Sequence, residues 1–243
     1  KATLGFALIG LPLGVQVTLL FADRLVRRFN FRFVLMVGIP LLGISQVLVA
    51  LSESPYTFAG ILMLGGAAIA VIEVAVNLEA DRVEAHIGHR IMNRSHAYWS
   101  FGFFGAGIVG AGFSQLGISP FSQFALITVL SSVLTILFFA KYDAAKARRQ
   151  SVVETNKGFV WPSKGIFLLV FFSLSAMLVE GASIDWSVIF MRDIFNTVPL
   201  VSGLSLALAA IAQGIIRYFA DQFVDKYGPE KVSLYSLISM VLG

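Results

Sequence analysis

Long apolar stretches separated by short polar segments make up most of the chain. A helix needs about 20 mostly apolar residues to cross the hydrocarbon layer of a bilayer. Seven stretches reach that length: 3–21, 33–51, 57–79, 96–117, 121–140, 165–190 and 199–219. An eighth apolar run begins near Val232 and reaches Gly243, which is shorter than a span. The pattern predicts an all-α integral membrane protein whose chain stops within a helix.

Composition supports a membrane protein and argues against several other classes. The chain is 57% hydrophobic and 13% charged, whereas soluble domains carry about 25% charged residues. It contains no cysteine, which excludes disulfides and thiolate metal sites. His86 and His89 form an H-x-x-H pair without a further ligand, so we expect no metal site.

Basic residues cluster in alternate loops. The segments 22–32, 80–95, 141–164 and 220–231 hold 15 of the 18 lysines and arginines. The positive-inside rule places these four loops in the cytoplasm. The basic balance is therefore a topology signal, and we expect no nucleic-acid partner. Lys1 would then lie outside, so the seven spans are interpreted as helices two to eight of a longer protein.

Two similar segments follow apolar stretches far apart in the chain. FADRLVRRF begins at Phe21 and FADQFVDKY begins at Phe219, 198 positions later. Internal repeats in a membrane chain are typical of secondary transporters built from two related bundles. We therefore expect a first bundle in 1–141, a cytoplasmic linker in 142–164 and the start of a second bundle in 165–243.

The repeated segment resembles the cytoplasmic signature of the major facilitator superfamily, G-x-L-A-D-R-x-G-R-K. Matching residues are Ala22, Asp23, Arg24, Arg27 and Arg28 in the first copy and Ala220, Asp221 and Lys226 in the second, with both glycines replaced in each. The resemblance implies two pseudo-symmetric six-helix bundles. It also implies a gating motif of Asp23, Arg24, Arg27, Arg28, Asp221 and Lys226, whose charge-assisted bonds form in one conformation and break in another. Alternatively, the arginines only fix topology among lipid headgroups.

Carboxylates within spans are costly and tend to face a cavity or a transport pathway. Glu73 and Asn77 lie four residues apart, on one helix face. Their E-x-A-x-N string resembles helix four of the fucose–proton symporter branch, where the glutamate takes part in proton coupling. The stretch that begins HAYWSFG at His96 resembles the start of that branch's helix five, with Trp99 replacing an asparagine. A neutral glutamic acid bonded between helices is the alternative for Glu73.

A second pair of carboxylates, Glu180 and Asp185, lies in the stretch 165–190. Five residues correspond to about 140° around a helix, so one cavity-facing stripe cannot hold both. Unwinding at Gly181 could bring them together. Glu180 is the better pathway candidate because it lies nearer the centre of the span. Arg217 precedes a predicted helix end, where we interpret it as snorkelling to the surface.

Small residues at regular intervals predict surfaces for close helix packing. One ridge consists of Gly102, Ala106, Gly110 and Ser114, and a second set consists of Gly203, Ala207, Ala209, Ala210 and Gly214.

These features predict a permease of the cytoplasmic (inner) membrane that moves a small solute by alternating access, coupled to protons. A sugar or related polar metabolite is the family-level expectation for the solute. The predicted pathway residues are Glu73, Asn77, His96, Trp99, Glu180 and Asp185. No nucleotide-binding or catalytic motif is present in the sequence, so we expect neither a cofactor nor an enzyme.

Two other classes compete with the permease. The count of seven spans also fits a seven-helix receptor or photoreceptor, although the span 199–219 has no lysine for a retinal Schiff base. An intramembrane enzyme has less support, because no nucleophile–base pair stands out.

Overall fold

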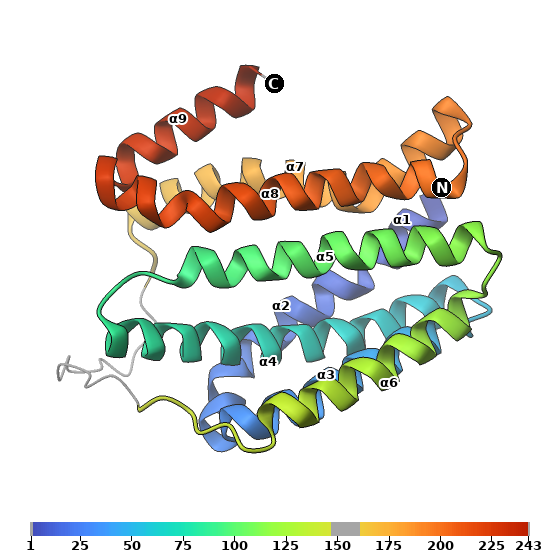
Figure 1. Cartoon of the computed structure of the whole chain (residues 1–243), viewed down its shortest axis with the longest axis horizontal. Coiled ribbons are helices and arrows are strands. Elements are labelled where there is room, and N and C mark those ends of the chain that lie inside the picture. Colours follow the sequence, from blue (N-terminus) through green and yellow to red (C-terminus); the bar gives the residue numbers. More distant parts are fainter. Residues whose placement is uncertain (1, 147–160, 243) are drawn as a thin grey trace. The chain divides into compact units, whose positions relative to one another are not determined.

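The computed structural model describes residues 2–146 and 161–242, and these residues form helices joined by short segments, without strands (Figure 1). The helices are α1 Ala2–Leu8, α2 Gly10–Arg28, α3 Phe31–Ala50, α4 Pro55–Ile87, α5 Met92–Gln115, α6 Pro120–Phe139, α7 Lys164–Phe195, α8 Pro199–Tyr227 and α9 Pro229–Leu242. The predicted all-α membrane fold is confirmed. Most of the predicted linker 142–164 lies outside the described residues.

Six helical segments in the described residues are long and apolar enough to cross a membrane. They are Thr3–Arg28, Phe31–Ala50, Pro55–Ile87, Pro120–Phe139, Lys164–Phe195 and Pro199–Tyr227. The remaining predicted span, 96–117, forms α5 but does not reach the same hydropathy. Glycines, serines and a polar first turn lower the mean hydropathy of this helix, although its 24 residues are enough to span.

Side-chain caps and proline positions explain where the helices begin. Ser54 and Thr57 form a capping box at the start of α4, and Pro55 occupies the first turn. Ser119 and Ser163 are the N-caps of α6 and α7. The side chain of each accepts a bond from the main-chain N–H three residues later.

Proline also divides the first span, which was predicted as one continuous helix over 3–21. The chain leaves the α-helical pattern at Ile9, between α1 and α2. Pro12 has no N–H to donate to the carbonyl of Leu8, and its ring crowds that carbonyl. The Ile9 N–H bonds to the carbonyl of Phe6, three residues earlier, with an N···O distance of 3.2 Å. This bond makes the turn between α1 and α2 tighter than an α-helical turn.

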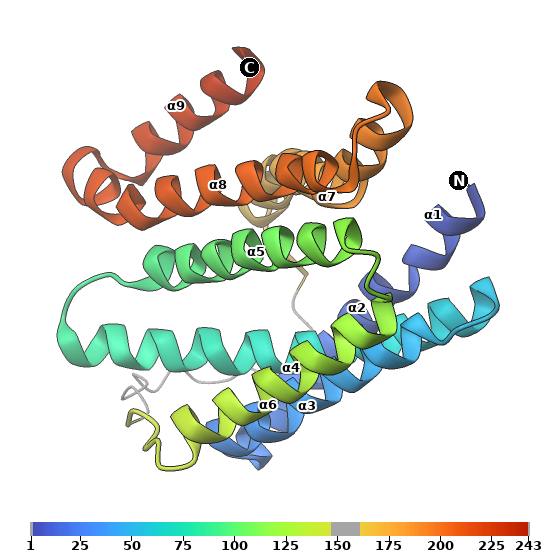
Figure 2. The ribbon, with the colours of Figure 1, turned by 45° about the vertical axis from the view of Figure 1, so that its right-hand side comes forward.

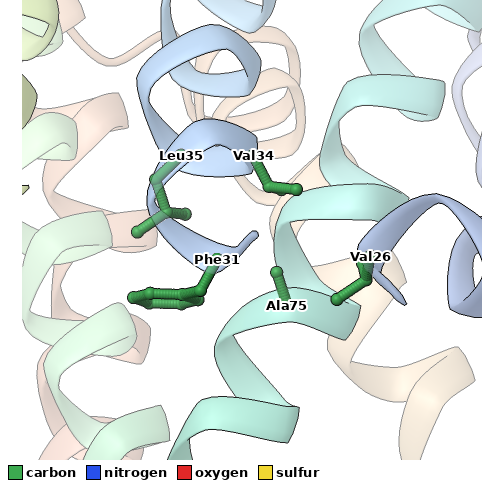
Figure 3. Close-up of a cluster of buried hydrophobic side chains, with 5 residues drawn as sticks. All are labelled: Val26, Phe31, Val34, Leu35 and Ala75. Carbon is green, nitrogen blue, oxygen red and sulfur yellow. The ribbon is translucent and has the colours of Figure 1, made fainter. Parts of the chain in front are cut away.

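The helices group into two compact units, of which the first contains α1 to α4 and α6. Within it, α3 packs against both α4 and α6 (Figures 1 and 2). Glycine lets α2 approach α4 closely, because a Cβ atom at Gly10 or Gly14 would overlap a main-chain carbonyl of α4. Near the other end of α2, Val26, Phe31, Val34, Leu35 and Ala75 form a buried apolar cluster (Figure 3).

The second unit contains α5, α7, α8 and α9. Small residues bring α5 and α8 together: Ala207 is fully buried against Gly107, and Gly203 faces Ala111. The predicted small residues of α8 are therefore mostly buried. The predicted ridge of α5 does not meet α8 at its first two residues, since a Cβ at Gly102 would have nothing within 4 Å and Ala106 is exposed. Its use as a packing surface stays a prediction.

A buried carboxylate ties the segment after α6 to α4 in the first unit. Glu79 is only 4% exposed. It accepts bonds from the Tyr142 hydroxyl at 3.0 Å and the Ala145 N–H at 2.5 Å, and Arg82 lies 3.4 Å away. Burial raises the pKa of the Tyr142 phenol, and the bond and charge of Glu79 raise it further. This clasp holds the chain in place where it leaves α6.

We expect Gly14→Ala to destabilise the first unit by about 1–3 kcal/mol, because the new methyl group has to push α2 away from α4. Gly60→Ala is the matched control, since nothing lies within 4 Å of a Cβ at that position of α4. Thermal unfolding of the purified protein measures both. Equal stability of the two variants would show that α2 and α4 are not in close contact.

The clasp predicts a loss of stability at alkaline pH. The folded-state pKa of Tyr142 lies above its ordinary value of 10.0. Above that pH the unfolded chain loses the phenolic proton while the folded chain retains it, so the free energy of unfolding falls as pH rises through this window. Comparison with Tyr142→Phe isolates the effect. At neutral pH the variant should be less stable by about 1 kcal/mol, and this deficit should shrink above pH 10. A pH-independent deficit would contradict the raised pKa.

Candidate functional site

A polar network joins α5, α7 and α8 of the second unit within otherwise apolar helices. Its members are Ser100, Glu180, Gln213 and Arg217. Gln213 and Arg217 lie one turn apart on α8, so both can reach the same region of α7.

Two donors of α8 bond to the same carboxylate oxygen of α7. The Gln213 Nε2 lies 2.8 Å from Glu180 Oε1, and an Arg217 terminal nitrogen lies 3.2 Å from that atom. The Arg217 and Glu180 side chains are 27% and 32% exposed. The pair is therefore partly shielded, and its bonds are charge-assisted.

Ser100 of α5 completes the network. Its side chain is fully buried, and its hydroxyl accepts a bond from the other Arg217 terminal nitrogen at 3.1 Å. The same hydroxyl lies within donating distance of Gln213 Oε1, at 3.2 Å, and of the His96 carbonyl, at 3.3 Å. Arg217 thus links α5 to α7.

An aromatic wall lies beside the network. The Arg217 guanidinium is 5.9 Å from the centre of the Trp99 ring, within the range of a cation–π interaction. Trp99 also packs against Phe103, with ring centres 5.1 Å apart.

A pocket of about 190 Å³ opens next to Glu180 in the second unit. Its lining residues are Trp99, Phe103, Glu180, Ser183, Ile184, Leu206, Ala209, Ala210 and Gln213. Most of these residues are apolar or aromatic, as is typical of small-molecule sites, and a few polar groups are available to fix the orientation of a ligand.

Of the predicted pathway residues, the structure brings Glu180 and Trp99 to this pocket. His96 contributes its main-chain carbonyl, and its ring makes no hydrogen bond with a described residue. Asp185 is exposed on α7 and does not line the pocket. The expectation of unwinding at Gly181 is wrong, because α7 is continuous from Lys164 to Phe195 and keeps the two carboxylates on different sides.

Glu73 and Asn77 lie on α4, in the first unit. Glu73 is exposed and Asn77 is partly buried, and neither side chain bonds to another described residue. Their place in a transport pathway stays a prediction.

The sequence interpretation missed three members of the network. Arg217 does not snorkel, because its guanidinium is engaged by Glu180, Ser100 and Trp99. Gln213 and Ser100 were not singled out. The available signal was the spacing of Gln213 and Arg217, two polar residues four positions apart within an apolar span.

The two copies of the repeated segment occupy different environments. In the first copy, both carboxylate oxygens of Asp23 lie 2.9 Å from Arg27 Nε, and these side chains are 60% and 70% exposed. Arg24 and Arg28 are also exposed. In the second copy, Asp221 is only 4% exposed and accepts a bond of 2.6 Å from Asn93, at the start of α5. Lys226 lies over the Tyr227 ring at 5.1 Å.

One oxygen of Asp221 and the Nε of Arg94 are buried without a partner among the described residues. The Arg94 guanidinium lies 5.6 Å from the Tyr218 ring. Within the same described residues, no group of three or more histidines and carboxylates could hold a metal ion.

Comparison with known proteins identifies the family of the chain. The chain matches the Major Facilitator Superfamily over residues 1–243. It is 29% identical over 248 residues to an uncharacterized MFS-type transporter of Yersinia pestis, covering 100% of this chain and 62% of that protein. It is also 29% identical over 248 residues to the uncharacterized transporter y4wD of Sinorhizobium fredii, covering 100% and 64%.

The chain therefore spans less than two thirds of the length of these relatives. No solved structure matches it. The predicted fucose-permease-like branch stays a prediction, because the name of neither relative gives a substrate. With its multi-pass helical fold and a family match along residues 1–243, the chain belongs to the Major Facilitator Superfamily.

Proposed function

We propose that the protein containing this chain is a secondary active transporter that carries a small solute across the cytoplasmic membrane by alternating access, together with a proton. The observation that carries this proposal is the Glu180–Arg217 pair beside the pocket of α5, α7 and α8. Family membership supports membrane transport. The comparisons do not favour the receptor alternative, and the proposal involves no catalysis.

Proton coupling follows from the cost of separating the pair. Removing one partner of an ion pair that is partly shielded from water leaves an uncompensated charge, which is unfavourable to the extent that water is excluded. A proton on Glu180 removes the negative charge and allows Arg217 to leave without that cost. Glu180 is thus the proposed coupling carboxylate, and Arg217 is the group that responds to its charge.

Alternating access requires contacts that form in one conformation and break in another. The bond between Asn93 and Asp221 is the proposed latch, because it joins the start of α5 to the second copy of the repeated segment. The exposed pair of Asp23 and Arg27 is the corresponding element of the first copy. Glu73, Asn77, His96 and Asp185 remain proposed pathway residues, and a sugar or another polar metabolite remains a candidate solute.

The latch predicts unequal effects of two similar substitutions. Asp221→Ala should lower stability by about 1–3 kcal/mol, because it leaves the half-buried Asn93 amide without its acceptor. Asp23→Ala removes an exposed pair and should cost less than about 1 kcal/mol. Thermal unfolding of the full-length protein in detergent compares them. Equal losses would argue against a special role for Asp221.

Proton coupling is tested by Glu180→Gln in the full-length protein reconstituted into liposomes. The amide keeps the shape of the side chain but cannot exchange a proton. Proton uptake with solute should be lost, whereas exchange of solute across the membrane should persist. The solute is identified first, with the wild-type protein, by testing which of a panel of sugars, organic acids and amino compounds drives proton uptake that a pH-sensitive dye inside the liposomes detects. Asp193→Asn, the same carboxylate-to-amide substitution on α7 at a residue that does not line the pocket, is the matched control. Normal proton uptake by Glu180→Gln would remove the coupling assignment.

A further inference from the structure

The pocket beside Glu180 has one charged corner and otherwise apolar walls. Trp99 and Phe103 of α5 form one wall of the pocket. The polar groups that line the pocket, Glu180, Ser183 and Gln213, come from α7 and α8. A sugar carries hydroxyl groups on all sides, each of which needs a polar partner when it leaves water. The pocket suits a solute that has one strongly polar group and an apolar body.

The donors that hold Glu180 already form a carboxylate receptor, in which Gln213 lines the pocket and Arg217 reaches it through its bond to Glu180. Gln213 and Arg217 direct N–H groups at Glu180 Oε1, at 2.8 and 3.2 Å, and Ser100 holds the second terminal nitrogen of Arg217. A guanidinium with an adjacent amide donor recognises carboxylates through charge-assisted bonds. Glu180 occupies this receptor as an internal carboxylate.

We propose that a carboxylate of the transported solute replaces the Glu180 carboxylate on Arg217 and Gln213 when Glu180 accepts a proton. The substrate is then a small organic monocarboxylate with an apolar body. This inference rests on the proposed proton-coupled transport and names its substrate class.

The charges balance through this exchange. With an empty pocket, the positive charge of Arg217 and the negative charge of Glu180 cancel. After exchange, Glu180 is a neutral acid and the charge of Arg217 is cancelled by the bound anion. Binding the anion alone would place two carboxylates on one guanidinium, and binding the proton alone would leave Arg217 unpaired, both of which are costly away from water. One proton and one monoanion therefore travel together without net charge.

The surroundings of Glu180 favour an anion over a cation. Among the described residues, Arg217 is the charged group bonded to Glu180. On α5, Ser100 contacts Arg217 through its hydroxyl, and His96 joins the network through its carbonyl. On α7, Asp185 is exposed and does not line the pocket. The Trp99 ring and Glu180, which could attract a cation, are both engaged by the Arg217 guanidinium.

The test measures binding to the full-length protein in lipid nanodiscs. The probes are acetate, butyrate and benzoate, their neutral amides, and benzylamine and glucose. Trp99 fluorescence reports binding in a background in which every other tryptophan of the full-length protein, Trp161 and Trp186 included, is replaced by phenylalanine. At least one carboxylate should bind at least about tenfold more tightly than its amide. The affinity for that carboxylate should fall about tenfold for each unit by which the pH rises, over the range in which Glu180 has to take up a proton on binding.

Variants separate the roles of the two charges. Glu180→Gln should bind the carboxylate at all pH values, because the amide mimics the neutral acid. Arg217→Gln should lose carboxylate binding, and Arg217→Lys should weaken it, since an ammonium cannot make the same fork of bonds. Arg192→Gln, which removes an exposed arginine of α7, should bind as the wild type does.

Tighter binding of the amides, benzylamine or glucose than of the carboxylates would overturn the inference. Carboxylate affinity that is independent of pH in the wild type, or unchanged by Arg217→Gln, would also overturn it. Proton-coupled uptake limited to neutral or cationic solutes would remove the carboxylate assignment and leave the proposed function intact. Carboxylate binding that needs Arg217 but drives no transport would remove the proposed function and keep the binding site.

Discussion

Inside a bilayer, a polar group has to find its partner within the protein. The hydrocarbon offers no water to satisfy a main-chain N–H or a side-chain charge, so the backbone folds into helices and the rare charged side chains collect on one another. Glu180 and Arg217 illustrate this constraint, because each occurs in a long apolar helix and each is engaged by the other. The same demand explains why Ser100, fully buried on α5, serves several partners at once.

The helices were largely predictable from the sequence because hydropathy is a local property. The long apolar stretches all form helices, and the polar segments between them carry the caps. The exceptions have local causes that hydropathy does not register, such as Pro12, which interrupts the first span. The packing surface of α5 was not predictable, because a ridge of small residues shows that close approach is possible without showing which neighbour uses it. In the structure, Gly107 and Ala111 meet α8.

The site was only half predictable, since a single side chain does not reveal its partner. Glu180 stood out as a carboxylate in an apolar span, but Ser100 lies 117 positions before Arg217 in the chain. Pairing over that separation is a property of the packed helices. The two copies of the repeated segment show the same limit. Asp23 and Asp221 have nearly the same local sequence, yet one is exposed and the other is buried against Asn93.

The α8 members of the proposed coupling network and of the proposed latch lie on one stripe of that helix. Gln213, Arg217 and Asp221 follow one another at intervals of four residues, so they share a face and together extend over about 12 Å of the helix. Ser100 and Asn93 of α5 contact this stripe at Arg217 and Asp221. In the proposed mechanism, a change in the charge of Glu180 alters the position that Arg217 prefers. Arg217 is bonded to α5 one helical turn from Asp221. That change would therefore act on the part of the α5–α8 contact where Asn93 bonds to Asp221. In the proposed mechanism, proton binding at the pocket and opening of the latch would therefore be two effects on a single pair of helices, and no separate relay would be needed.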